Sequence, residues 1–119
     1  MKKIWIAVII VLLIGAFFLV KPLFTGKTVE EAKLDKFAQD LTAAGLTMYG
    51  TSWCSHCQNQ KKLFDSSFKY INYVDCDKDS GICAIEGIKG YPTWKINGES
   101  YPGEKSLQDL ARLANVTFE

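Results

Sequence analysis

The chain has 119 residues, of which 48% are hydrophobic, and its 14 basic and 13 acidic residues give a formal net charge of +1. Four of the basic residues lie within the first 27 positions, so the remainder is weakly acidic, and nothing indicates a nucleic-acid partner. The 92 residues from Thr28 onward are enough for one small domain but not for two.

An uncharged apolar run from Ile4 to Val20 follows the basic N-terminus. At helical rise it covers about 25 Å, at the short end for a bilayer span, and residues 23–24 can extend it. The run lacks the small-residue cleavage site of a secretory signal peptide. We therefore expect residues 1–24 to be a retained signal-anchor helix that crosses the membrane once, with a cleaved signal peptide as the alternative.

The charges around this run predict its orientation. Lys2 and Lys3 precede it on a very short tail, which favours a cytoplasmic N-terminus. Two further lysines beyond the run weaken this bias, but four cysteines in a small domain also fit an oxidising compartment. We expect residues 25–27 to be a linker and residues 28–119 to be a domain outside the cytoplasm, in the periplasm or a lumen.

The order of elements predicts a mixed α/β domain. Thr28 and Glu31 form a capping box that begins a helix, and Gly45 is a natural stop for it. The elements expected next are a strand at 46–49, a helix at 55–67 with Leu63 and Phe64 inward, a strand at 70–74, a short helix at 80–86, a hairpin at 93–101 that turns at Asn97-Gly98, and a last helix from Ser106. A strand–helix–strand unit followed by a hairpin gives a mixed sheet flanked by helices.

Two cysteines three positions apart, Cys54 and Cys57, lie where the first expected strand passes into a helix. The first thiol is then at the helix N-terminus, where unpaired N–H groups and the helix dipole stabilise a thiolate. The second lies within the first turn, close enough to attack a mixed disulfide. This pattern indicates thiol–disulfide exchange with Cys54 as nucleophile and Cys57 as resolving thiol, while half of a zinc site and a structural disulfide are the alternatives.

His56, the one histidine, lies between these cysteines. A protonated imidazole beside Cys54 would favour the thiolate, and stabilising the reduced form makes a disulfide a stronger oxidant. We therefore expect His56 to tune the redox potential. The alternative is a solvated residue at a helix start.

The segment Trp53-Cys54-x-x-Cys57, together with Gly87 to Thr93 and Asn97-Gly98, resembles the thioredoxin superfamily. The longer runs at 48–58 and 90–98 are most similar to the thioredoxin-like domain of bacterial and plant vitamin K epoxide reductase homologues. The resemblance extends from residue 28 to about residue 116. It implies a thioredoxin-like mixed sheet and a thiol–disulfide oxidoreductase that needs no cofactor and no metal ion.

The resemblance also implies roles for residues outside the cysteine motif. Pro92 is expected to be a cis-proline that faces the redox pair, with the backbone of Tyr91 free to pair with an extended substrate segment. An ordinary trans turn is the alternative. Trp53, Tyr91 and Trp94 are candidates for an apolar collar around the sulfurs, with Trp53 exposed to partners and a core position as the simpler role for Trp94.

The chain departs from cytosolic thioredoxins in the strand before the motif. Met48 stands where they carry a buried acid, and Tyr73 stands where they carry the accompanying lysine. Their proton relay cannot operate through the same residues here. This argues against reductase behaviour and leaves the proton acceptor for Cys57 unidentified.

Cys76 and Cys83 form a second pair, at the end of a strand and the start of a short helix. A structural disulfide is the expected state, and a redox relay to Cys54–Cys57 or two free thiols are the alternatives. A zinc site built from Cys54, His56, Cys57 and one of this second pair would crowd three ligands on one turn.

Taken together, these features predict a membrane-anchored oxidoreductase that passes disulfides to cysteine-containing exported proteins. The resemblance implies reoxidation by a separate quinone-linked membrane protein of the vitamin K epoxide reductase type. Two other functions stay open: an extracytoplasmic reductant, for example in haem-protein maturation, and a non-catalytic module that binds cysteine-bearing proteins.

Overall fold

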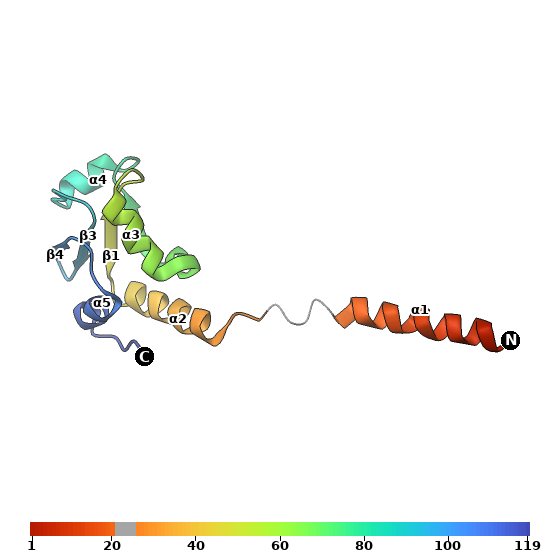
Figure 1. The fold of residues 1–119 in the computed structure, drawn as a ribbon. Helices are drawn as coiled ribbons and strands as arrows, with labels where there is room; N and C mark the ends of the chain where they lie inside the picture. The colour runs from red at the N-terminus through yellow and green to blue at the C-terminus, as the bar shows by residue number, and fades with distance from the viewer. Residues whose placement is uncertain (21–25) are drawn as a thin grey trace.

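The computed structural model describes residues 1–20 and 26–119, and for residues 18–20 only the backbone (Figure 1). The expected end of the anchor at residue 24 and the first linker residue lie outside the described residues. The described elements are α1 (Lys2–Val20), α2 (Val29–Ala43), β1 (Thr47–Gly50), α3 (Ser55–Phe64), the 3-10 helix η2 (Asp65–Tyr70), β2 (Asn72–Asp75), α4 (Ser80–Ile85), β3 (Thr93–Ile96), β4 (Glu99–Pro102) and α5 (Leu107–Ala114).

The N-terminal apolar run is helical, as expected. In α1 the large apolar side chains from Ile4 to Phe17 are exposed to solvent, each by about half or more of its surface. Within the described residues, no helix combines the length and the apolarity that a membrane crossing requires.

The four strands of the described residues form one mixed sheet with the order β2-β1-β3-β4. β1 pairs with β2 in parallel and with β3 in antiparallel, and β3 and β4 form the expected antiparallel hairpin. At the hairpin turn Asn97 and Gly98 have φ angles of 53° and 79°. Positive φ at both central residues is what a two-residue hairpin turn of this twist requires.

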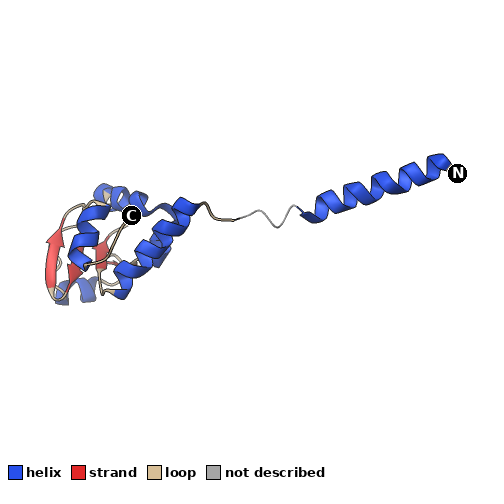
Figure 2. Ribbon diagram, turned by 90° about the horizontal axis from the view of Figure 1, so that it is seen from below, coloured by secondary structure: helices blue, strands red, loops and turns tan. Residues whose placement is uncertain are grey.

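Helices pack around this sheet (Figure 2), and the buried residues form a main hydrophobic core and a smaller cluster around Tyr49, Cys76 and Cys83. Thr28 and Glu31 form the expected capping box at the start of α2. Ser106 caps α5 by accepting a hydrogen bond from the Asp109 amide. The core residues with the largest fully buried side chains are Trp94, Phe64, Leu41, Leu46, Met48 and Leu110.

The helix that follows the cysteine motif is shorter than expected. It ends at Phe64 because Asp65 takes a φ of 48°, and the chain continues as η2 until Tyr70. Aspartate tolerates this left-handed region better than most residues do. Phe64 is fully buried as expected, but the inward placement of Leu63 was wrong, since its side chain is 45% exposed.

Candidate active site

Gly50 ends β1, and the next turn brings Cys54 to the N-cap of α3. The Cys54 sulfur accepts a hydrogen bond from the Cys57 amide at 3.1 Å. Cys54 keeps 7% of its surface exposed, whereas Cys57 has none. The two sulfurs are not bonded to each other. Cys54 is therefore the more accessible of the two sulfurs, and its role as the nucleophile stays a prediction.

The loop before β3 faces the Cys54 sulfur. The Tyr91–Pro92 peptide bond is cis, as the resemblance implied. The Cys54 thiol points to the Tyr91 carbonyl oxygen at 3.6 Å. This arrangement places the backbone of the Tyr91–Pro92 bend beside the nucleophile.

Two of the three expected collar residues line this site. Trp53 is 68% exposed, and its ring meets the Tyr91 ring edge-on at 6.0 Å between centroids. Trp94 is instead fully buried in the core, where its indole N–H donates to Gln60 Oε1 at 3.1 Å. The inclusion of Trp94 in the collar was therefore wrong, because its place in the middle of β3 directs it inward.

Asp77 holds the turn that carries Trp53, a role that no sequence motif indicates. Its carboxylate accepts hydrogen bonds from the Trp53 indole at 3.0 Å and from the Ser52 hydroxyl at 3.2 Å. Gln58 reaches back from α3 to the Ser52 carbonyl at 3.0 Å. The exposed indole beside the nucleophile is thus held in one orientation.

Cys76 and Cys83 are joined as a disulfide, with their Cα atoms 5.7 Å apart. The expected disulfide is confirmed, and the free-thiol alternative is wrong for this structure. The bridge links the end of β2 to α4 and packs against Tyr49 and Tyr91. It lies next to Asp77 in the chain and so ties down the loop that orients Trp53.

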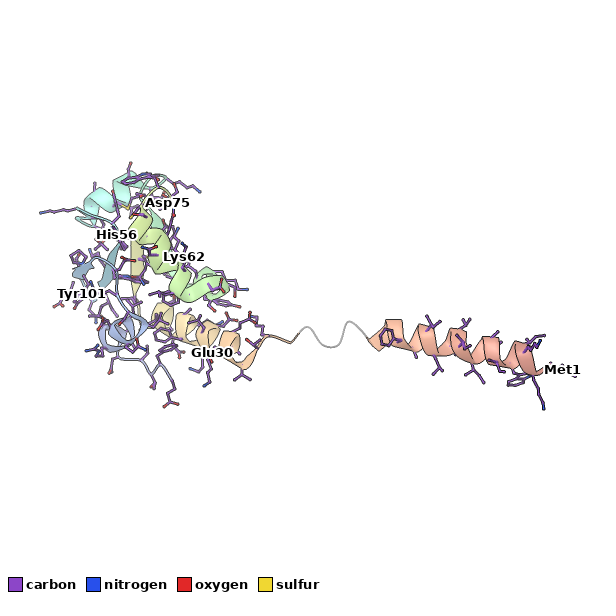
Figure 3. The ribbon with its side chains drawn as sticks, in the orientation of Figure 1. Met1, Glu30, His56, Lys62, Asp75 and Tyr101 are labelled. Carbon is purple, nitrogen blue, oxygen red and sulfur yellow. A yellow bond between two sulfur atoms is a disulfide. The ribbon has the colours of Figure 1, made fainter. Side chains whose placement is uncertain are left out.

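His56 does not turn toward the nucleophile. Its Nδ1 atom lies 2.9 Å from Glu104 Oε2, and this carboxylate is the one polar partner of the ring among the described residues. The side chain is 68% exposed at the end of the domain where α3 begins (Figure 3). Any charge on the imidazole is therefore partly offset by a neighbouring carboxylate, which the sequence did not indicate.

The resolving thiol lies in a poorly solvated place. Burial, and then its hydrogen bond with Cys54, raise the pKa of Cys57 to about 11. The Thr51 backbone and the Lys61 ammonium act in the opposite direction. At neutral pH Cys57 is consequently a thiol, and its proton has to leave when its sulfur attacks.

Among the residues that the structure describes, no carboxylate acts on the Cys57 thiol. Met48 is fully buried and lies opposite Tyr73 across the β1–β2 pair. Gly50 allows a close approach, since a Cβ atom there would lie 3.0 Å from the Cys57 sulfur. Met48 and Tyr73, two positions at which this chain differs from cytosolic thioredoxins, thus lie on the side of β1 that faces the resolving thiol.

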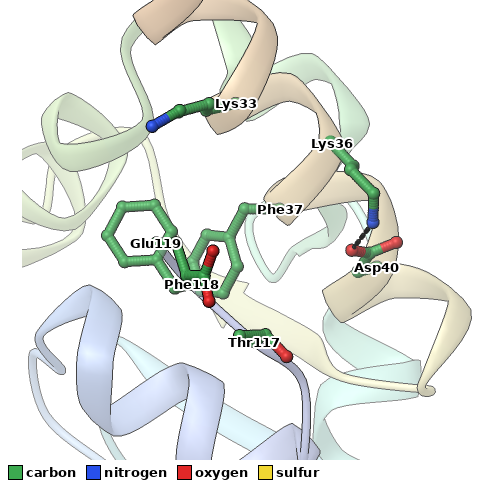
Figure 4. A pocket seen from close by; sticks show the side chains of 7 residues that line it. All are labelled: Lys33, Lys36, Phe37, Asp40, Thr117, Phe118 and Glu119. Carbon is green, nitrogen blue, oxygen red and sulfur yellow. Dashed lines mark hydrogen bonds and ion pairs between the residues drawn. The ribbon is translucent and has the colours of Figure 1, made fainter.

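A hollow of about 380 Å³ lies away from the cysteines, between α2 and the C-terminal residues (Figure 4). Phe118 packs on Phe37 there with 4.4 Å between ring centroids, and Lys36 pairs with Asp40 at its edge. Its polar groups are surface side chains, so we assign it no part in the chemistry.

No protein-family model matches the chain. It is 37% identical over 91 residues to thiol-disulfide oxidoreductase LTO1 of Arabidopsis thaliana, a match that covers 69% of this chain. It is 32% identical over 85 residues to protein disulfide isomerase-like 2-2 of Oryza sativa, covering 60% of this chain. The domain is thioredoxin-like. With its buried dithiol, this thioredoxin-like domain is of the thiol–disulfide oxidoreductase class, as expected.

The chain spans about a quarter of the length of these two relatives, 24% and 23% respectively. Among solved structures, the oxidised thioredoxin of Plasmodium falciparum matches with a TM-score of 0.42 and 22% identity, over 67% of this chain and 88% of the other. At that score the likeness adds no weight to the sequence matches.

Proposed function

We propose that this chain exchanges disulfides with exported proteins through Cys54 and Cys57, and that it acts mainly as an oxidant. The observation that carries the proposal is the position of the Cys54 sulfur. It caps α3, lies beside the cis-proline loop and is the less buried of two adjacent thiols. The name of the Arabidopsis relative, a thiol-disulfide oxidoreductase, supports the same chemistry.

The proposed oxidation proceeds in two exchanges. A thiolate of the client attacks the Cys54 sulfur of the Cys54–Cys57 disulfide, and Cys57 leaves with the electron pair and takes up a proton. A second client thiolate then attacks the client sulfur of the mixed disulfide and releases Cys54. The client gains one disulfide, and the protein is left as a dithiol that must be reoxidised.

The direction is supported by what surrounds the resolving thiol. Met48 supplies no carboxylate to accept the Cys57 proton, so the attack by Cys57 that completes a reduction lacks the usual proton acceptor. In the oxidising direction Cys57 is instead the leaving group and takes up a proton, but its raised pKa makes it a slower leaving group, so this pKa does not set the direction. A strongly negative redox potential would favour the reductant alternative.

The apolar N-terminal run supports membrane anchoring, with α1 in the bilayer and the catalytic domain outside the cytoplasm. A dithiol confined to the membrane surface can be reoxidised by a membrane protein. We propose a quinone-linked partner of the vitamin K epoxide reductase type, on the resemblance of residues 48–58 and 90–98.

The test uses the full chain in detergent micelles. The oxidised protein is mixed with a reduced peptide that carries two cysteines, and peptide oxidation is followed with and without a small-molecule oxidant. Multiple turnovers are expected, and Cys54→Ser should abolish them. A protein that binds the peptide but never oxidises it is a binding module. The equilibrium of Cys54–Cys57 with glutathione then separates an oxidant from a reductant.

A further inference from the structure

Tyr73 has a buried hydroxyl group to which the mechanism described so far assigns no role. Its hydroxyl is shielded from solvent and finds no hydrogen-bond partner among the described residues. The ring packs in a T-shaped arrangement with Phe68, with 5.5 Å between ring centroids, and the Lys61 ammonium lies 4.0 Å from the Tyr73 centroid. A buried hydroxyl without a partner costs free energy, so its retention calls for an explanation.

Gly50 shows where this hydroxyl lies. A Cβ atom built on Gly50 would be 3.0 Å from the Cys57 sulfur and 3.4 Å from the Tyr73 oxygen. The thiol and the phenol therefore lie on the same face of β1, both next to the position that a side chain of residue 50 would occupy. Their separation is within the reach of one bridging water.

We propose that the Tyr73 hydroxyl donates a hydrogen bond, directly or through one water, to the Cys57 sulfur when that sulfur carries negative charge. The inference rests on the exchange chemistry proposed above. It assigns Tyr73 to the step in which Cys57 attacks the mixed disulfide, and to the reverse step in which Cys57 leaves.

A hydrogen-bond donor stabilises the negative charge that the Cys57 sulfur carries in that step, while the proton of Cys57 passes through solvent and is balanced by the one that the departing client sulfur gains. The Cys57 S–H bond breaks, its sulfur bonds to Cys54, the bond from Cys54 to the client sulfur breaks, and the client sulfur leaves with the electron pair and gains a proton. Burial, chiefly, raises the pKa of Tyr73 to about 12, so the phenol keeps its proton while the Cys57 thiolate forms. Lys61 acts alongside it by lowering the pKa of Cys57, whereas Cys54 raises it, and Asp75 and Asp77 are charged groups that act on Tyr73.

The test follows the reactions of Cys54 and Cys57 as two successive steps. The reduced full chain in detergent micelles is mixed with 5,5′-dithiobis(2-nitrobenzoate), which releases one coloured thiolate when Cys54 attacks and a second when Cys57 resolves the adduct. In Tyr73→Phe the first release should keep its rate, and the second should slow about tenfold, which corresponds to about 1.4 kcal/mol. The pH profile of the second release should also move to higher pH.

Tyr49→Phe is the matched control, because it removes another buried tyrosine hydroxyl from the adjacent strand, beside the Cys76–Cys83 bridge. Both of its releases should keep the parent rates. If the second release in Tyr73→Phe is unchanged, or if both releases slow together, the proposal is overturned. If the parent protein itself gives no second release, the exchange function fails instead, so the two failures are distinguishable.

Discussion

The amide of Cys57 donates to the sulfur of Cys54 at 3.1 Å, so the nucleophile is itself the N-cap of the helix that holds its resolving partner. An N-cap side chain normally accepts such a bond through oxygen. Here the acceptor is the reacting sulfur, which places it at the positive end of the helix dipole. Charge on Cys54 is stabilised by the same contact that begins the helix.

Replacing Cys57 by serine should trap clients on Cys54, because the buried second sulfur can no longer release them. Reductant-sensitive adducts of the full chain should accumulate in membranes and be visible as shifted bands on non-reducing gels. Cys54→Ser should give none. Equal trapping by both variants would show that the assignment of nucleophile and resolving thiol is wrong.

Removing the Asp77 carboxylate should impair substrate handling more than stability. Asp77→Ala frees the Trp53 indole and the Ser52 hydroxyl, so we expect peptide oxidation to slow several-fold with a higher KM. Asp79→Ala is the control, since its side chain does not cap α4. Unchanged peptide kinetics in Asp77→Ala would mean that the orientation of Trp53 has no part in recognition.

Replacing His56 by leucine should make the redox potential more negative, since a positive imidazole favours the thiolate. Glu104 offsets part of this charge, so we expect a shift of no more than about 30 mV, which is about 1.4 kcal/mol for two electrons. Equilibration with glutathione buffers measures it. The double variant His56→Leu/Glu104→Gln should lie closer to the parent than His56→Leu does. A shift toward a more oxidising value would contradict this role.

Acid should weaken the domain through Asp35. This buried carboxylate accepts hydrogen bonds from the Lys27 ammonium and, at 2.6 Å, from the Ser67 hydroxyl, and these contacts lower its pKa. Its stabilisation is present above the unfolded pKa of about 3.9 and is lost as pH falls through the lower folded value. Asp35→Asn should lower the melting temperature at pH 7 and flatten its acid dependence. Asp79→Asn controls for net charge, and a parallel acid profile in Asp35→Asn would refute the assignment.

Removing the Cys76–Cys83 disulfide should show whether it has a structural role or relays electrons to Cys54 and Cys57. Cys76→Ser/Cys83→Ser should reduce the free energy of unfolding by about 2.5 kcal/mol, the loop entropy that so short a loop predicts. If the bridge is structural, the dithiol should still oxidise the peptide when a small oxidant is supplied. Loss of turnover with intact folding would favour a relay.

Local sequence signals predicted most of the fold. The capping box at Thr28, the Asn97-Gly98 turn and the strand-to-helix junction at Cys54 each depend on residues close together in the chain, and each is found as expected. The early end of α3 was missed, because a left-handed Asp65 has no strong signal in sequence. Side chains that meet across 24 to 48 positions, as Asp77 meets Trp53 and Glu104 meets His56, have no periodicity that would reveal them.

The disulfide between Cys76 and Cys83 affects how a newly synthesised chain matures. Asp77 directly follows Cys76, so the segment that orients Trp53 is held by a bond that a newly made chain does not yet have. A newly made molecule carries four thiols and needs an oxidant before this segment is held in place. Before it can act, the protein therefore depends on the same kind of thiol–disulfide exchange that we propose it to perform.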